Sequence, residues 1–308
     1  MNMAVSKTDD GAGALAPVLR SMLFVPGDSE RKLAKGASTG ADALILDLED
    51  AVAPARTAIA RQMVLDYLRS HSGPRTQQLW VRINPVNGAA ALEDLSVVAG
   101  APDGIVLPKV DSARDVLRLC HYLDALEVRE GLAKGAIRIL PVATETPGSM
   151  FAVGGYGACG ARLAGLTWGA EDLAAALGAS ASRRPDGSYD GVYQMARSLC
   201  LLGAGAAGVP AIDTIWSDFS DTAGLEADAK AARRAGFSGK LAIHPGQVAV
   251  INAAFTPEPE ELAWSKRVVE AFAADPGAGT IALDGKMLDM PHLKLAQRVL
   301  GLARVRGT

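Results

Sequence analysis

The sequence feature that most constrains the fold is a series of eight short apolar runs, each closed by a turn signal and mostly followed by a helical pattern. Successive runs begin roughly 20–45 residues apart, a spacing typical of strand–helix units. They are SMLFVPG, ADALILDLEDAV, QLWVRINP, GIVLPKV, IRILPVATET, LAGLTWGAED, VPAIDTIW and KLAIHPG. Strands that alternate with helices indicate a parallel sheet with right-handed crossovers.

Eight such units over residues 20–255 predict an α/β fold of the (β/α)8 TIM barrel type. A doubly wound open sheet is the alternative. It loses support because no GxGxxG follows the first strand and the chain has no P-loop. Residues 1–19 are small and polar, so we expect a disordered N-terminal tail. Residues 256–308 predict a C-terminal helical extension, in which a strand-like piece and a loop with Asp284 and Asp289 precede a last amphipathic helix.

Composition excludes several functional classes. The 308 residues carry a net charge of −3 with no Lys/Arg-rich block, which argues against a nucleic-acid partner. No apolar run approaches the roughly 18 residues of a membrane span, and the N-terminus lacks the pattern of a signal peptide. The three cysteines, Cys120, Cys159 and Cys200, have no CxxC spacing, which favours reduced thiols in a cytoplasmic protein.

Acidic residues end two consecutive apolar runs, the fifth and the sixth. The fifth delivers Glu145, and the sixth delivers Glu171 and Asp172. Carboxylates at neighbouring strand ends can share a hard divalent cation such as Mg²⁺. The alternative is that each acid only caps the helix that follows it. Because the pattern occurs twice in succession, we favour the metal site.

Other polar residues also fall at the predicted strand ends, where a barrel gathers its catalytic groups. They are Asp47, Glu49, Asp50, Arg82, Lys109, Asp213 and His244. One role for Arg82 is an ion pair with Glu49 or Asp50. The other is binding of a substrate carboxylate or oxyanion by its planar guanidinium, and the two roles are compatible. Lys109 is a candidate Schiff-base lysine, although a salt-bridge partner is the commoner role. His244 is a candidate base or a structural residue at a loop start.

Nine motifs occur in order from about Arg20 to Val305. They are LFVPGDSERKLAKG, LILDLEDAV, VRINP, LPKV, ETPGSM, GAEDLAAALG, AIDTIWSDFSD, KLAIHPGQV and DGKMLDMPHLKLAQRVL. Together they resemble the citrate lyase beta-subunit-like branch of the HpcH/HpaI aldolase family. The resemblance implies a Mg²⁺-dependent (β/α)8 barrel, a homotrimer or hexamer, that cleaves or forms a C–C bond between a 2-oxo acid and an acyl thioester enolate.

The resemblance also assigns roles to residues. It makes Glu145 and Asp172 the metal carboxylates and leaves Glu171 out. The arginine of the VRINP motif, Arg82, contacts the oxo acid or the enolate oxygen. The acids Glu49 and Asp50 line the site and hold water or the arginine.

Further implied contacts come from both ends of the chain. The basic residues Arg31, Lys32 and Lys35 fall where relatives contact the CoA phosphates. The DMP motif places Asp289, and not Asp284, in a C-terminal lid that reaches the active site of an adjacent subunit. There it gives or takes the proton at the enolate carbon.

The expected reaction is cleavage of malyl-CoA, citramalyl-CoA or a close analogue into a 2-oxo acid, glyoxylate or pyruvate, and acetyl-CoA. Bound Mg²⁺ would lower the pKa of the substrate hydroxyl, and Arg82 would offset the developing negative charge. Three alternatives stay open. They are a citryl-thioester lyase subunit with an acyl carrier protein as partner, a thioesterase for the same substrates, and a non-catalytic subunit.

Overall fold

The computed structural model describes residues 19–304. The predicted tail lies, except for its last residue, outside this part of the chain. The described residues form two compact units, one spanning Leu19–Thr256 and the other beginning at Pro257. No helix among the described residues is long and apolar enough to cross a membrane.

The first unit is built on one eight-stranded parallel sheet. Its strands are β1 (Ser21–Pro26), β2 (Ala43–Asp47), β3 (Gln78–Arg82), β4 (Gly104–Leu107), β5 (Arg138–Pro141), β6 (Leu166–Thr167), β7 (Ala211–Asp213) and β8 (Gly239–Ala242). Their order is β5-β4-β3-β2-β1-β8-β7-β6. Parallel bridges from Ile139 to Leu163 and from Val142 to Thr167 join the two outer strands, β5 and β6. The sheet therefore closes on itself, which confirms the predicted TIM barrel.

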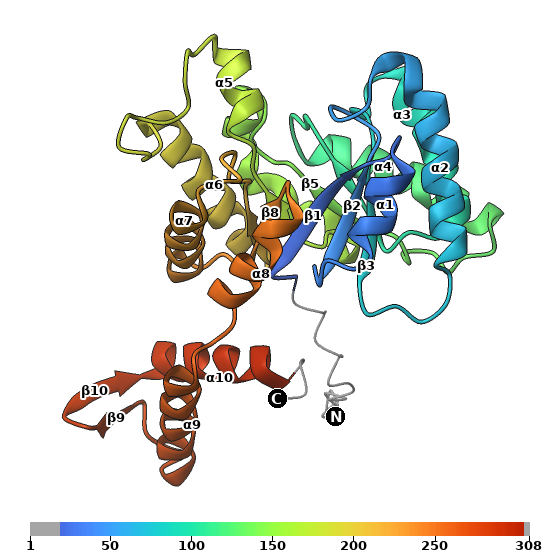
Figure 1. The fold of residues 1–308 in the computed structure, drawn as a ribbon. Coiled ribbons are helices and arrows are strands. Elements are labelled where there is room, and N and C mark those ends of the chain that lie inside the picture. The colour runs from blue at the N-terminus through green and yellow to red at the C-terminus, as the bar shows by residue number, and fades with distance from the viewer. Residues whose placement is uncertain (1–18, 305–308) are drawn as a thin grey trace, which may run out of the picture. The chain divides into compact units, whose positions relative to one another are not determined.

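Helices surround these strands in Figure 1. The helices of this unit are α1 (Glu30–Gly36), α2 (Thr57–Ser70), α3 (Ala89–Asp94), α4 (Ala113–Arg129), α5 (Glu171–Leu177), α6 (Gly191–Ala207), α7 (Thr222–Ala235) and α8 (Pro245–Ala254). Short 3-10 segments are η1 (Pro54–Arg56), η2 (Leu95–Gly100), η3 (Ser149–Phe151) and η4 (Val153–Arg162). The connection from β5 to β6 thus consists of 3-10 segments, whereas the connections between the other consecutive barrel strands contain an α-helix.

The barrel has two apolar layers because alternate strand residues face opposite sides of the sheet. Leu44 and Leu46 pack in the larger cluster that includes the helices, whereas Ala43 and Ile45 belong to a smaller cluster with Trp80. A Cβ atom on Gly104 would lie 2.3 Å from the Trp80 ring, so the glycine makes room for the indole. The smaller cluster fills the barrel interior, which leaves the strand ends as the place for a pocket.

The second unit contains α9 (Pro259–Ala274), β9 (Thr280–Leu283), β10 (Lys286–Asp289) and α10 (Met290–Arg304). The strands form an antiparallel hairpin. Asp284 and Gly285 lie at its tip with φ angles of 50° and 73°, the positive values of a two-residue hairpin turn. The expectation of one loop that contains both Asp284 and Asp289 was therefore wrong. Only Asp284 lies in a turn, and the Asp284–Gly285 pair is a typical signal for a two-residue hairpin. Asp289 ends β10 directly before α10.

Candidate active site

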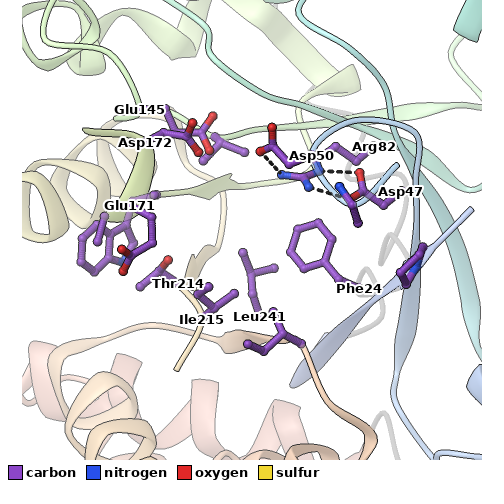
Figure 2. Close-up of a pocket in the computed structure, with 17 residues that line it drawn as sticks. Phe24, Asp47, Asp50, Arg82, Glu145, Glu171, Asp172, Thr214, Ile215 and Leu241 are labelled. Carbon is purple, nitrogen blue, oxygen red and sulfur yellow. Dashed lines mark hydrogen bonds and ion pairs between the residues drawn. The ribbon is translucent and has the colours of Figure 1, made fainter. Parts of the chain in front are cut away.

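A pocket of about 370 Å³ lies at the carboxyl ends of the barrel strands, within the range usual for small-molecule sites. Most of its lining comes from the ends of β1, β2, β5, β6, β7 and β8 and the residues directly after them. Figure 2 shows the carboxylates of Glu145 and Asp172 near each other, away from Arg82, which lies with Asp47 and Asp50. The barrel therefore gathers residues that the sequence separates by up to 219 positions, from Phe24 to Ile243.

Glu145 is held in a buried position four residues after β5. Its Oε2 accepts a hydrogen bond from the backbone N–H of Lys109 at 2.6 Å. Gly169 makes room for it, because a Cβ there would lie 2.7 Å from Glu145 Cγ. Burial, together with the nearby carboxylates of Asp172 and Glu49, raises the pKa of Glu145 to about 8. The positive charge near Glu145 is therefore too small to offset the burial of its ionised carboxylate.

Asp172 lies in the first turn of α5, and its side chain is 31% exposed. Its Oδ1 is 3.3 Å from Lys109 Nζ. Glu171 also lines the pocket but is exposed and belongs to no ion pair among the described residues. The backbone geometry thus presents Asp172, rather than Glu171, to the cluster around Glu145.

Arg82 is fixed by three acids. Asp47 accepts two hydrogen bonds, from Nε at 2.7 Å and from Nη2 at 2.6 Å. Nη1 lies 3.0 Å from Glu49 Oε2 and 3.5 Å from Asp50 Oδ2. The expected pairing with Glu49 and Asp50 is present, but the bidentate partner is Asp47. Asp47 and Arg82 are register partners on β2 and β3, which explains this choice.

The remaining edge of the guanidinium is available to a ligand. Arg82 has five N–H donors, and one N–H of Nη2 is not used by these acids in the described part of the chain. The ring of Phe24 lies 4.7 Å below the guanidinium carbon. Although burial alone would lower the pKa of Arg82, the three acids raise it above its ordinary value. Arg82 is therefore a permanent cation in the pocket.

Lys109 has a role that differs from the Schiff-base alternative. Its ammonium contacts Glu49 and lies 3.3 Å from both carboxylate oxygens of Asp50. Burial alone would lower the pKa of Lys109, but Glu49, Asp172 and Asp50 raise it above its usual range. A Schiff base needs a neutral amine. The surroundings of Lys109 therefore oppose that chemistry.

The buried Glu49 links the two cations, Arg82 and Lys109. Burial raises its pKa to about 7, although both cations act in the opposite direction. Its Oε2 makes no hydrogen bond of good geometry, despite its closeness to Arg82. Asp50 is more exposed, at 53% of its side chain. The acids after β2 thus surround the arginine, as the sequence suggested.

The donor set suits a hard divalent cation. Six carboxyl groups lie in and around the pocket against two cationic side chains, Arg82 and Lys109. In the part of the chain that the structure describes, no three His, Cys, Asp or Glu residues form a metal-binding group. Mg²⁺ is commonly held by one or two carboxylates with water and substrate oxygens completing its shell. The Glu145–Asp172 pair fits this pattern.

Two other strand-end candidates have structural contacts instead. Asp213 is buried and binds Arg197, Lys240 and the indole N–H of Trp168. It thereby anchors Trp168, which lines the pocket. His244 caps α8, where its Nδ1 accepts the N–H of Gly246 at 3.1 Å. Neither residue lines the pocket.

The basic residues implicated by resemblance alone lie on α1 and do not line the pocket. The side chains of Arg31, Lys32 and Lys35 are exposed on α1 and form no ion pair within the described residues. Asp289 belongs to the second unit, and its side chain is 45% exposed. Its Oδ1 lies 2.5 Å from His292 Nδ1, so the histidine orients the carboxylate.

Sequence reasoning missed part of the pocket. Asp47 was a strand-end candidate, but its bidentate hold on Arg82 was not expected. Trp168 and Gly169 were not singled out, although both precede the expected acid in the GAED motif. Apolar side chains such as Phe24 and Leu241 also line the pocket. Their signal was only their position near strand ends, which many core residues share.

Comparisons with known proteins agree with this fold and identify the family. The HpcH/HpaI aldolase/citrate lyase family matches residues 20–245. The chain is 37% identical to a citrate lyase subunit beta-like protein of Mycobacterium tuberculosis, over 90% of this chain and 93% of that protein. It is 32% identical to the mitochondrial citramalyl-CoA lyase of Homo sapiens, over 92% and 85%. It is 33% identical to a (3S)-malyl-CoA thioesterase of Cereibacter sphaeroides, over 92% and 94%.

A solved structure agrees with these relatives. The crystal structure of protein CitE from Mycobacterium tuberculosis, in complex with magnesium, acetoacetate and coenzyme A, aligns with a TM-score of 0.76. The two chains are 34% identical, and the alignment covers 94% of this chain and 99% of that one. The family match spans well over half of the sequence. The chain therefore belongs to the HpcH/HpaI aldolase/citrate lyase family, and it is a carbon–carbon lyase of the citrate lyase beta-like type.

Proposed function

We propose that this lyase is Mg²⁺-dependent and cleaves, reversibly, malyl-CoA, citramalyl-CoA or a close analogue into a 2-oxo acid and acetyl-CoA. The observation that carries the proposal is the carboxylate pair Glu145–Asp172, whose negative charge is not balanced by nearby cations, in one pocket with the fixed cation Arg82. The same arrangement explains why so much negative charge is gathered at one end of the barrel. Magnesium was bound, with acetoacetate and coenzyme A, in the CitE relative.

Glu145 and Asp172 would hold the metal. When bound, Mg²⁺ would supply a Lewis acid that polarises the hydroxyl and carboxylate oxygens of the substrate and favours transfer of the hydroxyl proton to a base. As the C–C bond breaks, its electron pair passes to the acyl thioester as an enolate. The free N–H of Arg82 then stabilises the developing negative charge. Asp47, Glu49 and Asp50 keep the guanidinium in place for this task.

The pocket favours an oxo acid with a single carboxylate. Among the described residues, Arg82 is the one Lys or Arg that lines it, and most of its N–H donors are already used. Apolar side chains, including Phe24, Val142 and Leu241, line the remainder. A citryl thioester carries one more carboxylate, whose desolvation there would lack a partner. This charge balance supports a malyl- or citramalyl-type substrate over the citryl-thioester alternative.

The rest of the substrate would be held by residues near the two ends of the chain. Arg31 and Lys35 lie four residues apart on α1, so their exposed cations are neighbours suited to CoA phosphates. Asp289 would donate the proton to the enolate carbon from a C-terminal lid of an adjacent subunit in a homotrimer or hexamer. Its half-exposed carboxylate is oriented by His292.

A thioesterase is the second candidate, because one relative at 33% identity is a (3S)-malyl-CoA thioesterase. Hydrolysis would break the C–S bond with water and leave the carbon skeleton intact. The same pocket and metal carboxylates would serve both reactions, so their products distinguish them.

Substrate and reaction can be tested together with a panel of malyl-CoA, citramalyl-CoA and citryl-CoA, assayed with Mg²⁺. We expect pyruvate or glyoxylate and acetyl-CoA from the first two, with kcat/KM at least about 100-fold lower for citryl-CoA because of its unpaired carboxylate. Chromatography of the products is the measurement. Free CoA with intact malate or citramalate would establish the thioesterase instead, and efficient citryl-CoA cleavage would contradict the charge argument.

The metal carboxylates can be tested against a neighbouring acid. Glu145→Gln and Asp172→Asn should each lower kcat/KM by at least about 100-fold, because each removes a charged ligand. Glu171→Gln, an equal change at the adjacent residue, should stay within about threefold of the wild type. EDTA should abolish wild-type activity and Mg²⁺ should restore it. Full activity in EDTA, or equal losses in all three variants, would refute the metal assignment.

Glu145 should also destabilise the metal-free protein. Since its pKa is raised from 4.5 to about 8, the folded state disfavours ionisation that the unfolded chain permits. Glu145 therefore does not lower the free energy of unfolding below pH 4.5, where it is protonated in both states. The loss of stability grows as the pH rises from 4.5 toward the folded pKa of about 8. In EDTA at pH 8, Glu145→Gln should raise the thermal unfolding midpoint by about 2–6 °C, with almost no gain near pH 4.5. An equal gain at both pH values would contradict this cause.

Subunit mixing tests the lid. Asp289→Ala and Glu145→Ala should each be inactive as pure preparations, whereas hybrids formed by refolding the two together should regain activity. The physical reason is that a mixed oligomer contains sites with an intact metal pair and an intact lid from different chains. If the hybrids stay inactive although mass spectrometry shows mixed oligomers, Asp289 does not act across subunits.

A further inference from the structure

Lys109 lies close to acids from two parts of the barrel, those that follow β2 and the one in the first turn of α5. Its ammonium contacts Glu49, lies 3.3 Å from Asp50 Oδ1 and lies 3.3 Å from Asp172 Oδ1. Asp172 makes no other ion pair or side-chain hydrogen bond in the described part of the chain. The lysine therefore provides the close positive charge for a residue that we assign to the metal.

The backbone of Lys109 contributes separately. Its φ angle of 50° lies in the left-handed region, which non-glycine residues seldom adopt. In this conformation its N–H donates to Glu145 Oε2 at 2.6 Å. One residue thus holds Glu145 with its main chain while it neutralises Asp172 with its side chain. Strained backbone of this kind is concentrated at functional sites.

We propose that the ammonium of Lys109 is a built-in counter-cation that competes with Mg²⁺ for Asp172. The inference rests on the magnesium site of the proposed function. A divalent cation held by Glu145 and Asp172 would lie close to Nζ, and like charges at such distances repel strongly. Mg²⁺ binding therefore requires Nζ to leave Asp172, while Glu49 and Asp50 retain it on the far side.

This role has a measurable consequence. With the lysine in place, each Mg²⁺ must displace an existing ion pair, so the affinity for the free metal is kept low. Removal of the ammonium leaves Asp172 unpaired and should strengthen metal binding. A residue that merely supports the site would act in the opposite direction, because its loss would disorder the ligands.

Isothermal titration with Mg²⁺ alone tests the competition without any turnover. Lys109→Met should lower the Kd for Mg²⁺ by about tenfold. Lys109→Asn should behave alike, and it keeps the test valid if the first variant folds poorly, because Asn tolerates positive φ. Lys109→Arg, which keeps the charge, should stay close to the wild type. Lys134→Met is the matched control, since it removes an exposed lysine paired with Asp124 before β5, at the opposite end of the barrel.

The outcomes separate the inference from the function on which it rests. Tighter binding in both neutral variants, with unchanged binding in Lys109→Arg and Lys134→Met, supports the counter-cation. Wild-type binding of Mg²⁺ with an unchanged or higher Kd in the neutral variants overturns it and leaves the magnesium site standing. An equal gain in Lys134→Met overturns it as well, since net charge alone would then be the cause. Absence of Mg²⁺ binding in every protein overturns both proposals.

Discussion

The burial of carboxylates that lie close to one another is the constraint on which the site depends. Glu49 and Glu145 are nearly buried, and each has a pKa raised by burial to near neutrality or above. Arg82 and Lys109 compensate the charge around Glu49, but within residues 19–304 the carboxylate of Glu145 has only a backbone N–H as a direct partner. Such an arrangement lowers the stability of the folded protein unless a cation binds. The loss of folding stability caused by these buried acids is therefore explained by the function of the site and not by the needs of the fold.

The barrel makes this arrangement possible because it holds the acids on rigid, separate elements. Glu145 follows β5, Asp172 lies in the first turn of α5 and Asp47 ends β2. Behind the pocket, the buried Asp213 joins Lys240 of β8 to Trp168 after β6. The carboxylates, which would repel one another and separate on flexible segments, are therefore held at fixed positions. A preorganised site of this kind needs little rearrangement when its ligand binds.

The sequence predicted what depends on local patterns. Apolar periodicity was enough for the eight strands. The acids at two strand ends indicated Glu145, Glu171 and Asp172, and the family resemblance then favoured Asp172 over Glu171. The contacts between strands were harder. LILDLED presents acids at three positions, and only the register of β2 against β3 decides that Asp47 holds Arg82. The position of the Lys109 ammonium depends on an unusual backbone angle that composition does not encode. For Asp289, the motif gave the residue, whereas the contact with His292 depends on α10 beginning directly after β10, which places the histidine three residues on in the first turn of the helix.

The central claim is that Glu145 and Asp172 share one divalent cation at the carboxyl end of the barrel. Anomalous diffraction from crystals soaked in Mn²⁺, an analogue of Mg²⁺ that can be located directly, tests it without reference to any reaction. We expect one strong anomalous peak with a carboxylate oxygen of each residue about 2.1 Å away. A peak at other residues, or none in the pocket at saturating Mn²⁺, would contradict it.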